Sequence, residues 1–215
     1  MSRGWIFFWI ALFCEVLTWS LGAQSQTGKA KETSPVLRKR WWFMKTCSGD
    51  KPGGHAWNND WDAHFRFECP PAQSISSIYS IFRDCRRDRL FEFKCKYTFA
   101  AGYYGNHCHW TGYLNDFDQP IKFRCPDGQF LAGVESYHQN HQEDRRFKFK
   151  CCGYPNPQHY HVSSCYKTSE VNNWRGVLNY EVPNFHYLVG AESVHWNSKE
   201  DRRWKFEVCK IPAEP

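Results

Sequence analysis

Clusters of basic residues recur along the chain in a form that could bind acidic ligands. An acidic–arginine–arginine sequence precedes alternating aromatic residues at 143–151 and again at 200–208, with a weaker copy at 87–95. Guanidinium groups bind carboxylates and sulfates through paired hydrogen bonds, so a row of them suits a glycosaminoglycan or another acidic sugar. The candidate ligand-binding residues are Arg145, Arg146, Arg202, Arg203, Lys148 and Lys205.

The first arginine of each cluster also has a structural interpretation. Arg89, Arg145 and Arg202 align across the three clusters. An Asp–Arg pair beside aromatic strands can stabilise a sheet by ion pairing and cation–π contact, and its repetition favours this role. Arg146 and Arg203 alternate with the apolar residues as exposed groups do, so ligand contact and a structural role both stay open for them.

Metal binding and catalysis are not expected. His107 and His109 could present two imidazoles on one strand face, as could His159 and His161, but neither pair recurs in another copy. The adjacent carboxylates at 143–144 point to opposite faces of a strand, which suits acid–base catalysis poorly. Phosphate-binding glycine loops, zinc-binding helices and nucleophile elbows are missing from the sequence. We therefore expect a binding protein, not an enzyme, with no cofactor and no metal.

The three clusters belong to one repeated unit. The copies cover 56–97, 108–154 and 165–211, and corresponding residues lie 56 and then 57 positions apart. The aligned sets are Asn59/Asn115/Asn172, Trp61/Phe117/Trp174, Phe67/Phe123/Tyr180, Pro70/Pro126/Pro183 and Ser80/Ser136/Ser193. We interpret the asparagines as turn formers that open the first strand. The aromatic residues of the second set could stack on a sugar, but core packing is favoured.

Each copy has the pattern of three antiparallel strands. In the second copy apolar and basic residues alternate over 121–125, a Pro-Asp-Gly turn follows, and strand patterns resume over 130–137 and 145–151. A period of two indicates strands with one buried face. We therefore predict an all-β fold, in which three short antiparallel β meanders form one disulfide-bonded globular domain with pseudo-threefold symmetry. Aromatic faces point inward and charged faces outward.

The cysteines indicate an oxidising compartment and suggest their own pairing. Cys14 lies in an expected signal peptide, which leaves ten cysteines and thus five disulfides. Cysteines 26 positions apart occur in the first two copies, and both are valines in the third. Cysteines 44 positions apart occur in the last two copies, and both are absent from the first. Because partners are absent together, the predicted pairs are Cys69–Cys95, Cys125–Cys151, Cys108–Cys152, Cys165–Cys209 and, by elimination, Cys47–Cys85.

The N-terminus has the pattern of a secretory signal. Arg3 precedes an apolar run over 5–17, and small residues follow, so we expect a signal peptide over 1–23 with cleavage near Ala23. The apolar run is shorter than the roughly 20 residues that a membrane-spanning helix needs, which argues against an anchor. We therefore expect the protein to be secreted.

A basic segment follows the expected signal peptide. Residues 24–40 are rich in Ser, Thr, Gly and Lys and poor in apolar residues, so we expect disorder. The basic residues at its end could direct cleavage after Arg40 by a secretory convertase, which would make the segment a propeptide. A solvated basic arm is the alternative. In both cases we expect residues 41–215 to form the folded domain.

Several of these motifs resemble those of one known family. They are the repeated Asp-Arg-x-aromatic-x-aromatic hexapeptide, the Phe-x-Cys-Pro strand end and the adjacent Cys151 and Cys152, and together they resemble the dermatopontin family. The resemblance covers 56–211, and the segment 115–120 is more similar to invertebrate members. It implies an extracellular-matrix protein. Vertebrate members are tied to proteoglycan binding, collagen fibril assembly, cell adhesion and growth-factor modulation, whereas invertebrate members include agglutinins, biomineral-matrix proteins and cytotoxins.

One departure from the vertebrate pattern concerns the N-terminal segment. Vertebrate members carry an acidic, tyrosine-rich N-terminus that becomes sulfated, whereas residues 29–45 here are basic and contain no tyrosine. Tyrosine sulfation is therefore not expected in this chain.

These observations predict a secreted, extracellular protein that binds proteoglycans or other matrix polyanions and supports cell adhesion or matrix assembly. Collagen and cell-surface receptors are further candidate partners, whereas nucleic acid binding and stable membrane insertion are not expected. Salt should weaken the binding because it screens surface charges. Two alternatives use the same scaffold: a multivalent lectin that agglutinates cells by avidity, and a secreted cytotoxin released by cleavage at Arg40.

Overall fold

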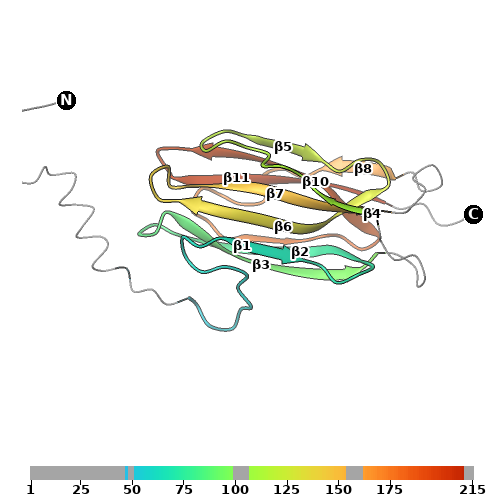
Figure 1. Ribbon diagram of the computed structural model, residues 1–215, viewed down its shortest axis with the longest axis horizontal. Helices are drawn as coiled ribbons and strands as arrows, with labels where there is room; N and C mark the ends of the chain where they lie inside the picture. Colours follow the sequence, from blue (N-terminus) through green and yellow to red (C-terminus); the bar gives the residue numbers. More distant parts are fainter. Residues whose placement is uncertain (1–46, 48–50, 99–106, 154–161, 211–215) are drawn as a thin grey trace, which may run out of the picture.

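The computed structural model describes Cys47 and residues 51–98, 107–153 and 162–210 of the chain (Figure 1). Within these ranges it contains eleven strands, and no helix there is long and apolar enough to cross a bilayer. The strands are β1 (Phe65–Glu68), β2 (Gln73–Arg83), β3 (Asp88–Tyr97), β4 (His107–Trp110), β5 (Ile121–Arg124), β6 (Gln129–Gln139), β7 (Asp144–Gly153), β8 (Ser163–Lys167), β9 (Leu178–Glu181), β10 (His186–Trp196) and β11 (Asp201–Lys210).

Some sequence predictions fall outside the described residues. They are the signal peptide over 1–23 with cleavage at Ala23, the basic segment 24–40 with cleavage at Arg40, and the pair His159 and His161. These features stay predictions from the sequence.

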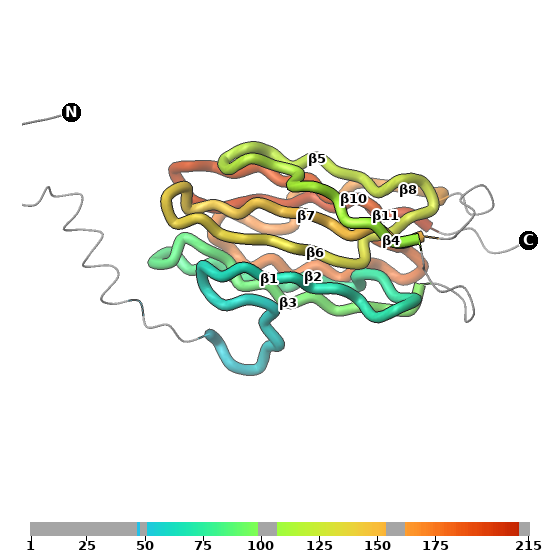
Figure 2. The backbone as a smooth tube through the Cα atoms, viewed as in Figure 1, coloured from blue at the N-terminus to red at the C-terminus, as the bar shows by residue number. Residues whose placement is uncertain are grey.

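The strands form three antiparallel sheets, each built around one long hairpin. Sheet A has the order β1-β6-β7-β4, sheet B the order β3-β2-β9, and sheet C the order β5-β10-β11-β8. The hairpins are β6–β7 in sheet A, β2–β3 in sheet B and β10–β11 in sheet C. Their turns gather at one end of the molecule, as the backbone trace in Figure 2 shows. An all-β architecture therefore holds for the described chain, as the alternation of the sequence predicts.

The first strand of each copy pairs with the hairpin of another copy. β1 pairs with β6 of the second copy, β5 with β10 of the third, and β9 with β2 of the first. The sequence analysis expected the three strands of each copy to form a meander, and the pairing of the first strand differs from that expectation. Each copy thus donates its first strand to the sheet of another copy, and the three donations form a closed cycle. We interpret this cycle as a pseudo-threefold arrangement.

The alternation of side chains along each hairpin creates the core. In β7, Phe147 and Phe149 point inward, whereas the alternating basic residues Arg146, Lys148 and Lys150 stay half-buried on the outer side. Phe147 is buried between Phe91 of sheet B and Trp204 of sheet C, at ring-centre distances of 6.1 and 5.0 Å and in edge-on geometry. Such aromatic pairs each add about 0.5–1.5 kcal/mol beyond their burial. The core is therefore shared by all three sheets.

The five disulfides of the structure join the same pairs that the repeat alignment predicts. They are Cys47–Cys85, Cys69–Cys95, Cys108–Cys152, Cys125–Cys151 and Cys165–Cys209.

The two repeated types of bridge have different places in the fold. The pairs separated by 26 residues connect different sheets, because the first cysteine follows a donated strand and the second lies on the copy's own hairpin. The pairs separated by 44 residues connect neighbouring strands of one sheet. At the third boundary between sheets, Val182 and Val208 are buried in place of a bridge.

Candidate functional site

The Asp-Arg motifs form a closed ring of three buried ion pairs. Each arginine donates from Nε and Nη2 to both carboxylate oxygens of an aspartate from another copy, at distances between 2.6 and 2.9 Å. The pairs are Arg145 with Asp88, Arg202 with Asp144, and Arg89 with Asp201. All six residues are at most 4% exposed. The ring therefore ties each copy to the next at the end where the hairpin turns lie.

Backbone groups make further hydrogen bonds to the ring. One carboxylate oxygen of each aspartate also accepts a backbone N–H, from Asp62, Asp118 or Arg175. These three donors have φ values of 60–64°, so the chain turns sharply to aim the N–H at the ring. Each arginine also donates to a carbonyl oxygen of the same turns.

The ring corrects two of the ligand-binding assignments made from the sequence. Arg145 and Arg202 are 4% exposed and already bind carboxylates, so they are not available to an external ligand. The structural role favoured for the first arginine of each motif is the one that the geometry supports. The signal was present in the sequence, because Arg145 lies two and four residues before Phe147 and Phe149 on the same strand and therefore faces inward as they do.

The aligned asparagines hold the hairpins in place. Asn115 is 5% exposed; its Nδ2 donates to the carbonyl oxygen of Arg145 at 3.0 Å, and its Oδ1 accepts the backbone N–H of Phe147 at 3.0 Å. Asn59 and Asn172 make the corresponding bonds in their copies. The side-chain amide thus extends the β ladder by one unit, a role beyond the turn formation that the sequence suggested.

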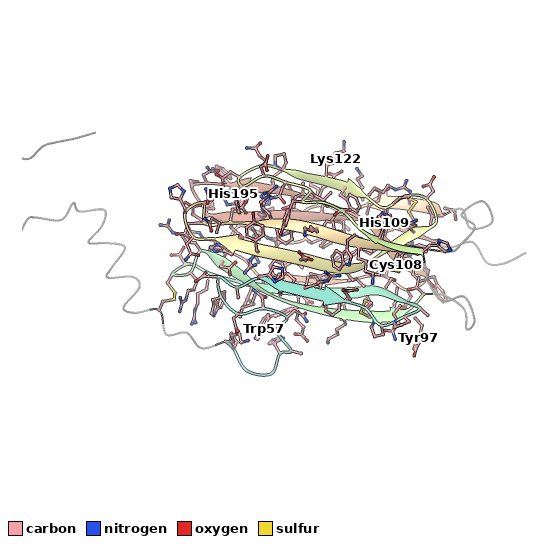
Figure 3. The ribbon with its side chains drawn as sticks, in the orientation of Figure 1. Trp57, Tyr97, Cys108, His109, Lys122 and His195 are labelled. Atoms are coloured by element: carbon pink, nitrogen blue, oxygen red, sulfur yellow. A yellow bond between two sulfur atoms is a disulfide. The ribbon has the colours of Figure 1, made fainter. Side chains whose placement is uncertain are left out.

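Two buried histidines beside the ring escaped the sequence analysis. His195 lies close to the end with the hairpin turns (Figure 3); its Nδ1 is 3.3 Å from Asp118 Oδ1 and its Nε2 is 3.9 Å from Asp144 Oδ1. His138 Nδ1 is 3.8 Å from Asp62 Oδ1. Both imidazoles are 1% exposed.

Asp62, the carboxylate beside His138, lies in an unfavourable environment for charge. Burial, and after it the nearby Asp88, raises the pKa of Asp62. The trio Asp118, Asp144 and His195 has ligand atoms within 4.8 Å of one another. The guanidinium of Arg202 already neutralises Asp144, which opposes a divalent cation at this place.

The second arginine of the motif lies on the outer face of sheet A, over aromatic rings. The guanidinium of Arg146 lies 4.6 Å from the ring centre of Tyr113 and 5.9 Å from that of Phe117. Its nearest carboxylate, Asp116, is 3.0 Å away and 82% exposed. Lys148 Nζ lies 4.4 Å from the same Tyr113 ring. We call Arg146, Lys148, Tyr113 and Phe117 the sheet A platform.

Sheet C has a corresponding arrangement. The guanidinium of Arg203 lies 5.3 Å from the ring of Trp174, which packs edge-on against the half-exposed Trp196 at 5.4 Å. Glu170 accepts from Arg203 at 2.7 Å and lies 3.8 Å from Lys205. We call Arg203, Lys205, Trp174 and Trp196 the sheet C platform.

The outer face of sheet B is different. Leu90, at the position of Arg146 and Arg203, is fully buried and carries no charge. Glu92 replaces the lysine of the other copies and accepts a hydrogen bond from His55, whose ring stacks on Tyr79 at 4.5 Å. The exposed basic-aromatic arrangement therefore occurs on two of the three sheets.

The remaining predicted residues lie outside the core and the ring. Trp61, Phe117 and Trp174 are half-buried on outer surfaces and do not belong to the hydrophobic core, which corrects the core packing favoured from the sequence. Trp61 lies under the guanidinium of Arg83 at 5.8 Å. His107 and His109 are exposed on β4, on either side of the disulfide-bonded Cys108.

Comparison with known proteins identifies relatives of the whole folded region. The family model described as dermatopontin matches residues 59–213. The chain is 41% identical over 156 residues to the hemagglutinin/amebocyte aggregation factor of Limulus polyphemus, covering 73% of this chain and 88% of that protein. It is 37% identical to the dermatopontin of Biomphalaria glabrata, covering 68% and 94%, and 35% identical to Millepora cytotoxin-1 of Millepora dichotoma, covering 70% and 65%. No solved structure matches the chain.

Proposed function

Because the chain belongs to the dermatopontin family, we propose that it is a secreted extracellular-matrix protein that binds sulfated or otherwise polyanionic glycans. It acts by binding and not by catalysis. The several disulfides fit an oxidising, extracellular environment. Through this binding it supports cell adhesion or matrix assembly.

The observation that carries the proposal is the pair of basic-aromatic platforms on the outer faces of sheets A and C. Arg146 and Arg203 hold their guanidinium groups against aromatic rings, which fixes their position at the surface. Lys148 and Lys205 extend each platform along the strand. A flexible chain of sulfates or carboxylates can therefore meet two ordered cations on one strand.

The carboxylates that pair with the two platform arginines do not prevent such binding, whereas Lys148 keeps the 10% exposed Glu135 as its partner at 2.9 Å. Asp116 and Glu170 are 82% and 38% exposed, and an exposed ion pair of this kind contributes only about 0–1 kcal/mol. A sulfate can displace these partners at low cost, because the cation keeps its aromatic support. Aromatic faces beside the cations also offer contact to the apolar side of a sugar ring.

The experiment is chromatography of purified protein on immobilised heparin with a salt gradient. We expect retention to fall steeply as salt rises, and the double variants Arg146→Gln/Lys148→Gln and Arg203→Gln/Lys205→Gln to elute earlier. Lys94→Gln is the matched control, because Lys94 is an exposed lysine on the hairpin of sheet B, which has no platform. Retention that ignores salt, or that falls equally in the control, contradicts the proposal.

A multivalent lectin is the second candidate, supported by the presence of two platforms on one molecule. Two equivalent sites can bridge two cells and raise the apparent affinity through effective concentration. A relative 41% identical to this chain is named hemagglutinin/amebocyte aggregation factor. In this case either double variant alone should abolish red-cell agglutination while heparin binding by the intact platform persists. Agglutination that survives the loss of one platform counts against this bridging role.

A further inference from the structure

Two disulfides of the same kind join an edge strand to a hairpin strand. Cys108–Cys152 connects β4 to β7 in sheet A, and Cys165–Cys209 connects β8 to β11 in sheet C. In the second bridge Cys165 is exposed, whereas Cys209 is fully buried. In sheet A, too, the edge-strand residue Cys108 is exposed and Cys152 is buried, so each bridge joins an exposed residue to a buried one.

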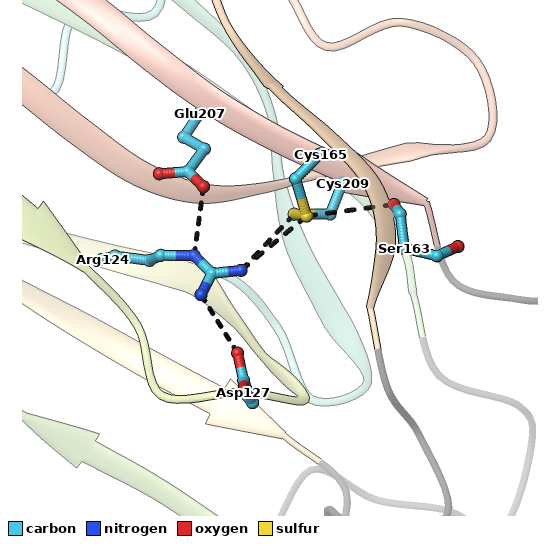
Figure 4. The surroundings of a disulfide bond; sticks show 6 residues. All are labelled: Arg124, Asp127, Ser163, Cys165, Glu207 and Cys209. Atoms are coloured by element: carbon cyan, nitrogen blue, oxygen red, sulfur yellow. Dashed lines mark hydrogen bonds and ion pairs between the residues drawn. A yellow bond between two sulfur atoms is a disulfide. The ribbon is translucent and has the colours of Figure 1, made fainter.

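An arginine points at the sulfurs of the sheet C bridge. Arg124 lies at the end of β5, the strand that the second copy donates to sheet C. Its Nη2 is 3.7 Å from Cys165 Sγ and 3.9 Å from Cys209 Sγ (Figure 4). Glu207 and Asp127 accept from its other nitrogens at 3.1 Å each and hold the guanidinium in this orientation.

Sheet A carries the opposite charge at the corresponding position. Glu68 pairs with Gly133 in β6, as Arg124 pairs with Gly190 in β10. A hydrogen bond from Lys150 lowers the pKa of Glu68, so this carboxyl group is charged at neutral pH. The two bridges therefore share a place in their sheets but differ in the charge beside the end of the donated strand.

This difference matters for thiol–disulfide exchange. The rate of exchange rises when the departing sulfur forms a more stable thiolate, and a nearby guanidinium stabilises a thiolate. We propose that Cys165–Cys209 is a labile disulfide, which a dithiol reductant opens in preference to Cys108–Cys152. The proposal does not depend on glycan binding.

The exchange balances in two steps. A thiolate of the dithiol attacks Sγ of the exposed residue Cys165, the Sγ–Sγ bond breaks, and its electron pair leaves on Cys209 Sγ beside Arg124. The second sulfur of the dithiol, after losing its proton, attacks its partner in the mixed disulfide and releases Cys165 as a thiolate. The reductant becomes a disulfide, two electrons pass to the protein, and the two protons of the dithiol go to the cysteine thiols or to solvent.

Opening this bridge releases an edge strand. All five residues of β8 are exposed, and its pairing with β11 is interrupted by a register shift between Val208 and Lys210. The disulfide spans this interruption. Reduction should therefore loosen β8 and uncover the edge of β11, while the three hairpins and the ring of ion pairs stay in place.

The test is limited reduction of the folded protein with dithiothreitol, followed by alkylation and peptide mass spectrometry. We expect Cys165 and Cys209 to be alkylated before Cys108 and Cys152. The variant Arg124→Gln should slow the opening of Cys165–Cys209 by about tenfold, because the leaving thiolate loses its cationic neighbour.

Two further variants keep the result interpretable. Lys122→Gln removes an exposed cation two residues earlier on β5, so it should leave the rate of reduction unchanged. Arg124→Lys keeps the charge and should retain most of the wild-type rate. The proposal is overturned if Cys108–Cys152 opens first or at the same rate, if Arg124→Gln is reduced as fast as the wild type, or if Lys122→Gln slows reduction as much as Arg124→Gln does.

Discussion

The variant Asp144→Asn tests whether the ring of ion pairs holds the three copies together. Asp144 accepts Nε and Nη2 of Arg202 at 2.7 and 2.6 Å, and its second oxygen also accepts the backbone N–H of Asp118 at 2.9 Å. An amide has an acceptor at only one of its two terminal atoms. In either orientation of the amide its NH2 group therefore faces an N–H of the guanidinium, and the buried charge of Arg202 is left without a counterion.

The expected loss of stability is about 4 kcal/mol. Two hydrogen bonds between charged groups account for about 3–6 kcal/mol, and removing one partner of a buried ion pair generally costs about 3–5 kcal/mol. With a slope of about 4 kcal/mol per molar in guanidinium chloride, the midpoint of unfolding should fall by about 1 M.

The assay is equilibrium unfolding followed by tryptophan fluorescence, with disulfides intact. Asp116→Asn is the matched control, because Asp116 also pairs with an arginine, at 3.0 Å, but is 82% exposed. Its loss should change stability by no more than about 1 kcal/mol. If Asp144→Asn unfolds at the same denaturant concentration as Asp116→Asn, the ring does not stabilise the fold as we argue.

Three other changes probe the fold. Val182→Cys/Val208→Cys should form a sixth disulfide at the boundary between sheets that lacks one, and it should raise the free energy of unfolding by up to about 3 kcal/mol. Non-reducing mass spectrometry tests for the bond and thermal unfolding measures the stability. Free thiols at these two positions in the folded protein would contradict the prediction. Asn115→Ala leaves two buried backbone groups without partners, so the free energy of unfolding measured with denaturant should fall by about 2–4 kcal/mol. A loss below about 1 kcal/mol would argue against the role of Asn115 in holding the hairpin. Asp62→Asn should be more stable than the wild type at neutral pH, because the raised pKa of Asp62 makes its ionisation unfavourable in the folded state. The difference in stability between Asp62→Asn and the wild type should shrink as the pH falls through the raised pKa of Asp62 toward the ordinary value of 3.8. A difference in unfolding free energy that stays constant across this pH range would contradict the prediction.

The repeat made much of the fold predictable. Alternation fixed which side chains face inward, because a strand has a period of two whatever its partner is. The cysteine pairs followed from a second argument: Cys69 and Cys95 are replaced together by Val182 and Val208 in the third copy. Neither argument needs the strand order, which explains why both agree with the structure.

The choice of strand partners was not predictable from the same pattern. Phe67 of β1 faces the core equally well beside its own hairpin or beside β6, because both positions offer the same apolar face. Donation to the next copy is decided by contacts distant in sequence, such as the pair Arg145 and Asp88, 57 residues apart. Alternation cannot report such contacts.

The platforms were only half predictable. The alternation of side chains along a strand identified Arg146 and Arg203 as outward-facing. It could not show that Tyr113 and Trp174 support them, because these aromatic residues lie in irregular segments without a period. The lack of a platform on sheet B was visible in the sequence, because Leu90 and Glu92 stand at the positions of Arg146 and Lys148.

The cyclic donation of first strands has a consequence for how such a molecule can be divided. No single copy contains a complete sheet, since β1, β5 and β9 each serve a hairpin elsewhere in the chain. A peptide with one copy alone would expose an unfilled hairpin edge and an unused strand of complementary shape. Three such peptides could satisfy one another head to tail, so the isolated third copy should assemble as a homotrimer and should not persist as a folded monomer.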